Sequence, residues 1–180
     1  MSSDGAGAEA FVAVGSNVAP WRNVPIALKL LEQRTTVTAS STFYRTAPIG
    51  PPGQPPFVNG VWRLFAADVD TARRHLQEVE RACGRLRTRN RYAPRPIDLD
   101  LVLFGDLVAD QPDLKLPHDD LWRPFVGVCV LELVPELRVP GLGRRLRDVL
   151  GERHGKTVAA MTPSQIDQPL TDAVHRILAG

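Results

Sequence analysis

Two aspartates placed two residues apart, Asp98 and Asp100, directly follow a stretch that is rich in arginine. The arginines of this stretch are Arg81, Arg85, Arg87, Arg89, Arg91 and Arg95. Paired carboxylates supply oxygen ligands for a hard cation, and arginine guanidinium groups bind phosphate oxygens through paired hydrogen bonds. A polyphosphate carried with Mg²⁺ needs both kinds of group at once. The pattern therefore predicts a site for a Mg²⁺-bound polyphosphate.

Each half of this pattern also has a simpler explanation. An Asp-x-Asp pair on a strand is most often a solvated face, and clustered arginines also fit a solvated helix end or an RNA contact. A non-catalytic RNA-binding module would use the arginines for phosphates and aromatic residues on its sheet for base stacking. The sequence shows no such aromatic motif, and Asp98 and Asp100 would repel RNA. The combined pattern therefore favours the metal and phosphate site.

Both aspartates are predicted to lie on one face of a strand. Over residues 97–104, apolar residues at the odd positions alternate with Asp98 and Asp100, so the carboxylates project away from the leucines. Side chains two residues apart on a strand have Cβ atoms roughly 6–7 Å from each other. This spacing lets the two carboxylates share one metal ion or hold two adjacent ones. A helix with one apolar face over residues 72–86, capped by Asp70, precedes the arginine-rich loop.

The other elements follow from the same kinds of pattern. We expect strands over 11–14, 36–44 and 57–65, and a stiff proline-rich loop over 46–56. A helix is predicted near residues 24–31, capped by Asn23 with Pro25 in its first turn, and a last helix from about Pro124 to Pro135. This order predicts an α+β fold, a ferredoxin-like α/β sandwich with a mainly antiparallel sheet.

Composition limits the domain organisation and the location. The chain has 180 residues, 43% of them hydrophobic, and a net charge of +2, which suits one domain and argues against a general nucleic-acid or membrane binder. We expect a flexible leader over 1–8, one domain over 9–150, and a C-terminal extension or partly disordered tail over 151–180, with Val174, Ile177 and Leu178 able to form a short helix. No secretory signal or membrane-spanning stretch is visible, so we expect a cytoplasmic protein.

Around the paired aspartates the sequence resembles the 6-hydroxymethyl-7,8-dihydropterin pyrophosphokinase family of folate biosynthesis. The family signature, Gly or Ala, Pro-Arg, two variable residues, Asp-Leu-Asp and two aliphatics, corresponds to residues 93–102. Three other blocks match in the same order: Gly15-Ser16-Asn17, residues 43–50 followed by Gln54-Pro55 and Asn59, and Leu116-Pro117-His118 followed by Arg123-Pro124-Phe125. The resemblance covers residues 10–150.

The resemblance implies a reaction and its partners. ATP would donate its β,γ-pyrophosphoryl group to the hydroxymethyl oxygen of 6-hydroxymethyl-7,8-dihydropterin, leaving AMP, with two Mg²⁺ ions as cofactors. No nucleic acid or membrane takes part, and we expect a monomer. A paralogue that binds pterin without turnover stays an alternative, although Asp98, Asp100, Arg85 and Arg95 are all present.

The resemblance also implies the role of individual residues. Asp98 and Asp100 match the metal ligands, and Arg85 and Arg95 match the catalytic arginines that contact the ATP phosphates. The ATP-binding positions correspond to Gln77, Glu80, Arg87, Tyr92, His118 and Arg123. Of these, Arg87 and Tyr92 match the mobile lid of the family, with Tyr92 standing where the family commonly has Trp. The pterin-binding positions correspond to Thr46, Ala47, Ile49, Phe57, Asn59 and Phe125.

Overall fold

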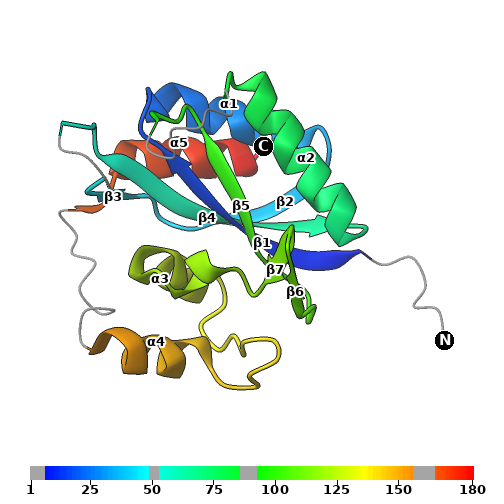
Figure 1. Cartoon of the computed structure of the whole chain (residues 1–180). Coiled ribbons are helices and arrows are strands. Elements are labelled where there is room, and N and C mark those ends of the chain that lie inside the picture. The colour runs from blue at the N-terminus through cyan, green and yellow to red at the C-terminus, as the bar shows by residue number, and fades with distance from the viewer. Residues whose placement is uncertain (1–6, 49–52, 86–92, 156–164) are drawn as a thin grey trace.

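A computed structural model describes residues 7–48, 53–85, 93–155 and 165–180 (Figure 1). The predicted lid residues Arg87 and Tyr92 and the predicted pterin contact Ile49 lie outside these ranges, as do residues 1–6 of the predicted leader. The elements in chain order are β1 (Ala8–Ser16), α1 (Pro20–Glu32), β2 (Thr36–Ser40), β3 (Tyr44–Thr46), β4 (Phe57–Ala66), α2 (Val69–Ala82), β5 (Asp98–Phe104), β6 (Ala109–Gln111), β7 (Leu114–Leu116), the 3-10 helix η1 (Asp119–Trp122), α3 (Pro124–Leu133), α4 (Leu146–His154) and α5 (Gln168–Leu178).

The main sheet has the strand order β2-β4-β1-β5, and the short strand β3 pairs with β4 beyond the end of β2. The pairings of β1, β2, β3 and β5 in this sheet are all antiparallel. Because β1, β2, β4 and β5 alternate with α1 and α2 as βαββαβ, the ferredoxin-like fold predicted from the sequence is confirmed. Strands β6 and β7 form a separate hairpin.

Helices cover both faces of the sheet. Figure 1 shows α1, α2 and α5 on one face, and α3 and α4 on the other. Alternate residues of β4 serve the two layers: Trp62 and Leu64 belong to the core under α1 and α5, whereas Val61 belongs to the core against α3. No helix in the parts of the chain that the structure describes is long and apolar enough to cross a membrane.

Two predicted helix starts are wrong. Helix α1 begins at Pro20, whose missing N–H costs nothing at the first helical position, so Pro25 lies beyond the first turn and Asn23 is not the cap. In α2 the N-cap is Asp68, because its carboxylate accepts a 2.7 Å hydrogen bond from the Thr71 N–H, and Asp70 lies within the first turn. Local apolar periodicity locates a helix but leaves the choice between nearby capping residues open.

The predicted strand 36–44 is broken in the structure. Strand β2 ends at Ser40 and β3 begins at Tyr44, because the backbone N–H groups of Thr42 and Phe43 bond to side chains outside the sheet. The Phe43 N–H donates to the Thr171 side chain and the Phe43 carbonyl accepts from the Asp167 N–H, both in the C-terminal segment. This segment contains α5, and α4 and α5 both follow α3, so the helix that begins at Pro124 is not the last one.

The predicted alternation along β5 holds only for its first half. The pairing with β1 shifts between Phe11 and Val12, and this irregularity turns Leu103 to the α3 side of the sheet together with Val102. Phe104 then packs on the other side with Leu99 and Leu101. The irregularity lies beyond Asp98 and Asp100, so their predicted common face is unchanged.

Candidate active site

A pocket of about 390 Å³ opens on the α3 side of the sheet, at the end where β1 finishes and β4 and β5 begin. The residues predicted from the sequence that line it are Thr46, Ala47, Phe57, Asn59, Arg95, Asp98, Asp100, Arg123 and Phe125. The structure therefore brings together nine of the predicted site residues from β3, β4, β5, α3 and their flanking loops. A pocket of this size with convergent polar groups is the usual form of a small-molecule site.

Strand pairing sets the floor of the pocket. Gly15 of β1 lies opposite Asp98, and Ala13 lies opposite Asp100. On the other side of β1, Gly15 lies opposite Asn59 of β4. A Cβ atom at Gly15 would come within 3.1 Å of the Asn59 side-chain oxygen and 3.9 Å of the Asp98 Cβ atom. A glycine here therefore leaves room between the carboxylates and Asn59.

One end of the pocket carries the acids, and we call Asp98, Asp100 and Asp120 with Arg95 the acidic end. The Arg95 guanidinium forms an ion pair with Asp98, and the Arg85 guanidinium lies 2.5 Å from the other oxygen of the same carboxylate. Asp98 is thus held between the two predicted catalytic arginines. Asn17 fixes the Arg95 backbone, because its side-chain oxygen accepts a 2.8 Å hydrogen bond from the Arg95 N–H.

Glu80 connects α2 to this end of the pocket. Its carboxylate pairs with Arg85 and accepts a 2.8 Å hydrogen bond from the N–H of Leu99, between the two aspartates. Burial raises the pKa of Glu80, while the Leu99 N–H and Arg85 oppose that shift. Glu80 and Arg85 do not line the pocket itself. In this structure Glu80 pairs with Arg85, and Arg85 contacts the Asp98 carboxylate.

Asp100 lacks the arginine pairing that Asp98 has. Burial, followed by the neighbouring charges of Asp98 and Asp120, raises the pKa of Asp100 to about 7. The carboxylates of the acidic end therefore repel each other in a poorly solvated place, and a cation bound there would relieve this repulsion. In the described parts of the chain, no three Asp, Glu, His or Cys side chains are arranged to hold a metal ion by themselves.

The other end of the pocket is aromatic and amide-bearing, and we call Thr46, Phe57, Asn59 and Phe125 the aromatic end. Thr46 lies opposite Phe57 in the pairing of β3 with β4. The Asn59 side-chain N–H donates a 2.7 Å hydrogen bond to the Thr46 hydroxyl. Phe125 approaches from the first turn of α3. Aromatic faces with one amide suit a flat polar heterocycle.

Like Glu80, two further predicted nucleotide contacts, Gln77 and His118, do not line the pocket. Gln77 lies on α2 outside the lining residues. His118 caps η1, where its ring nitrogen accepts a 3.2 Å hydrogen bond from the Asp120 N–H. Asp120 itself was missed by sequence reasoning, although it lies between the two residues His118 and Arg123 that were predicted. It lines the pocket and forms a 2.9 Å ion pair with Arg123.

The sequence model of the family described as 7,8-dihydro-6-hydroxymethylpterin-pyrophosphokinase (HPPK) matches residues 11–135. The chain belongs to this family. HPPK membership confirms the resemblance stated from the sequence and makes the chain a pyrophosphokinase that acts on hydroxymethyldihydropterin in folate biosynthesis, with ATP as co-substrate.

Individual relatives agree with HPPK membership. The chain is 41% identical over 146 residues to 2-amino-4-hydroxy-6-hydroxymethyldihydropteridine pyrophosphokinase of Pseudomonas aeruginosa, covering 78% of this chain and 88% of the relative. It is 34% identical over 137 residues to the protein of the same name from Haemophilus influenzae, covering 73% and 84%. A crystal structure of Plasmodium falciparum HPPK-DHPS with pteroate has the same fold, with a TM-score of 0.67 at 13% identity. That match covers 89% of this chain but 45% of the Plasmodium chain, so this HPPK chain spans less than half of that protein's length.

Proposed function

We propose that this pyrophosphokinase binds the ATP phosphates at the acidic end of the pocket and the pterin at the aromatic end. The observation that carries the proposal is the shared floor of the pocket, on which Gly15 separates the Asp98 carboxylate from Asn59. A substrate hydroxymethyl group extending from the aromatic end would thus meet the phosphates beside Asp98. Such positioning accounts for most of the rate in phosphoryl transfer.

Asp98 and Asp100 are the residues proposed to hold two Mg²⁺ ions. Their donor set fits, because both offer carboxylate oxygens to one pocket, and burial followed by the charges of Asp98 and Asp120 raises the pKa of Asp100 there. When bound, Mg²⁺ would neutralise phosphate charge and orient the reacting oxygens. The remaining oxygen ligands would come from the nucleotide and from water, as is usual for Mg²⁺ at phosphate sites.

Arg85 and Arg95 are proposed to stabilise the charge that builds on the transferring phosphates. Both guanidinium groups contact Asp98, so they are within reach of phosphates bound at the same carboxylate. When phosphates bind, these guanidinium groups would pair with phosphate oxygens in place of Asp98 and supply positive charge at the transferring group. Asn17 holds Arg95 by accepting a hydrogen bond from its backbone N–H, and Glu80 holds Arg85 through an ion pair with its guanidinium group.

Phe57 and Phe125 are proposed to enclose the pterin ring, with Asn59, Thr46 and Ala47 reading its polar edge. All five residues line the pocket, which supports this assignment. Phosphate or adenosine contacts by Gln77, Glu80, His118 and Arg123, and the lid roles of Arg87 and Tyr92, stay predictions. So do the monomeric state, the cytoplasmic location and the lack of nucleic-acid binding.

The experiment that tests the proposed function is AMP release from Mg-ATP with and without 6-hydroxymethyl-7,8-dihydropterin. We expect AMP only when the pterin is present, and no release when EDTA removes the divalent metal. Binding of both ligands without AMP release would contradict the catalytic assignment and point to a paralogue without turnover.

A further inference from the structure

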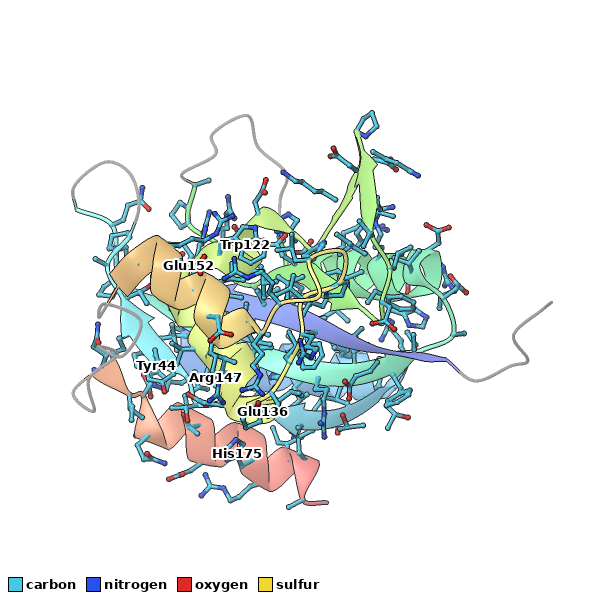
Figure 2. The ribbon with its side chains drawn as sticks, turned by 90° about the horizontal axis from the view of Figure 1, so that it is seen from below. Tyr44, Trp122, Glu136, Arg147, Glu152 and His175 are labelled. Carbon is cyan, nitrogen blue, oxygen red and sulfur yellow. The ribbon has the colours of Figure 1, made fainter. Side chains whose placement is uncertain are left out.

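The C-terminal segment, residues 165–180, packs against the sheet edge that leads into the aromatic end of the pocket. Leu170 and Val174 of α5 are fully buried in the core beneath α1. Further along the helix, the His175 ring lies 2.9 Å from the Ser40 carbonyl at the end of β2. Figure 2 shows Tyr44 beside the start of α5, with His175 farther along that helix. The segment thus follows the edge from β2 to β3.

Strand β3 depends on contacts from outside the sheet. It is three residues long and pairs with β4 on one side. On its outer side Tyr44 forms an antiparallel bridge with Ile166, and the preceding Phe43 backbone exchanges hydrogen bonds with Asp167 at 2.8 Å and Thr171 at 3.0 Å. A strand this short gains little stability from its own ladder, so its place is set by these partners.

Asp167 is the centre of these contacts. Its carboxylate is fully buried and forms a 3.0 Å ion pair with Arg45 of β3. It also accepts 3.2 Å hydrogen bonds from the Trp21 indole N–H of α1 and the Leu170 N–H of α5. A buried carboxylate is costly unless such donors compensate it, so the geometry of all three elements is tied to this group.

The position of β3 in turn sets the aromatic end of the pocket. Arg45 lies opposite Val58, and the next residue, Thr46, lies opposite Phe57 and accepts the hydrogen bond from Asn59. A displacement of Arg45 therefore moves Thr46 relative to both Phe57 and Asn59. The three carboxylates of the acidic end come from β5 and η1, and within the described residues no hydrogen bond or ion pair joins them to α5.

We propose that Asp167 is a positioning residue for the pterin subsite, which it sets through its ion pair with Arg45 and the register of β3. This inference rests on the proposed function, because it takes Thr46, Phe57 and Asn59 as pterin contacts. Its consequence is selective: loss of the Asp167–Arg45 pair weakens pterin binding and leaves nucleotide binding unchanged.

The test compares equilibrium binding of the two substrates to the full-length chain. Calorimetry gives the Kd of a non-hydrolysable ATP analogue with Mg²⁺, and then the Kd of 6-hydroxymethyl-7,8-dihydropterin in its presence. We expect Asp167→Asn and Arg45→Gln to raise the pterin Kd by about fivefold to tenfold and to leave the nucleotide Kd within about twofold. Arg45→Lys keeps the cation, so it should restore part of the pterin affinity.

Two variants serve as controls. Asp172→Asn removes an exposed carboxylate from the same helix, which accepts a hydrogen bond from the Gln168 side-chain amide one turn earlier, and should change neither Kd. Asn59→Ala removes a proposed pterin contact directly and should weaken pterin binding. The Arg45 side chain is 53% exposed, so we expect the Arg45 variants to fold. Their binding constants can then be measured even if Asp167→Asn unfolds.

Three results would overturn the inference. If Arg45→Gln and Asp167→Asn leave the pterin Kd unchanged while Asn59→Ala weakens pterin binding, Asp167 has no positioning role and the proposed function stands. Equal losses of both substrates would assign Asp167 to general stability. An unaffected Asn59→Ala would remove the proposed pterin subsite itself, and the inference with it.

Discussion

The acidic and aromatic ends of the pocket are built by different means. At the acidic end, Asp98 is paired with Arg85 and Arg95, and these charges must exchange partners when phosphates arrive. At the aromatic end, Phe57 and Asn59 are placed by the pairing of β3 with β4 and by one side-chain hydrogen bond. Under the proposed function, catalysis would therefore depend on charge compensation, and recognition of the heterocycle would depend on strand register.

Loss of a carboxylate at the acidic end should have the largest effect. Asp98→Asn or Asp100→Asn should lower kcat by about a thousandfold or more, because either change removes a charged oxygen ligand from the proposed metal site. Steady-state AMP release measures kcat, and circular dichroism checks the fold. Asp110→Asn, an exposed carboxylate on β6, is the matched control and should retain full activity. Near-normal turnover in either site variant would be incompatible with the metal role.

Removal of an arginine should come next. Arg95→Gln should lower kcat by about a hundredfold while changing the pterin Kd little, since the proposed partner of Arg95 is the transferring phosphate. Arg144→Gln, which breaks a surface ion pair with Glu152, is the control. The measurement is a full kinetic analysis in both substrates. A change confined to the pterin KM would mean that Arg95 takes part in pterin recognition and not in catalysis.

A change at the aromatic end should show the opposite division. Phe57→Ala should raise the pterin Kd by about tenfold through lost aromatic contact, with a smaller effect on kcat at saturating pterin. Phe65→Ala, on the same strand but 47% exposed, provides the control. Fluorescence or calorimetric titration with the pterin measures the change. If Phe57→Ala lowered kcat as strongly as Arg95→Gln, the two ends would not be separable.

The smallest effect should be on stability at the acidic end. The pKa of Asp100 is raised to about 7 by burial and by Asp98 and Asp120, whereas an unfolded aspartate titrates near ~3.9. The protonated form therefore favours folding below about pH 4, and this contribution is lost as the pH rises through about 7. Without divalent metal, Asp100→Asn should gain about 1–3 kcal/mol in unfolding free energy relative to the parent between pH 4 and pH 8.

Urea denaturation at several pH values measures this difference, with Asp110→Asn as the reference. A pH-independent difference between Asp100→Asn and the parent would mean that Asp100 is not the group whose protonation is coupled to folding.

Sequence reasoning predicted the parts of the site that depend on local patterns. Asp98 and Asp100 share a face because strand alternation holds at the start of β5. Asp120 was missed because η1 is too short to leave a periodic signal. The break between β2 and β3 was also missed, since its cause, the bonding of Phe43 to the C-terminal segment, joins residues more than a hundred positions apart. Such contacts depend on the tertiary fold, and a local window does not contain them.

The direction of β1 has a practical consequence for studying the enzyme. The strand runs from Ala8 to the pocket, whose first lining residue on β1 is Ala13, so the start of the strand lies roughly 17 Å from the pocket by the rise of a β-strand. In Figure 1 the start of β1 lies on the side of the sheet away from β3. An affinity tag or sensor surface coupled to that end would keep the mouth of the pocket open, which suits immobilised screening of pterin-like compounds.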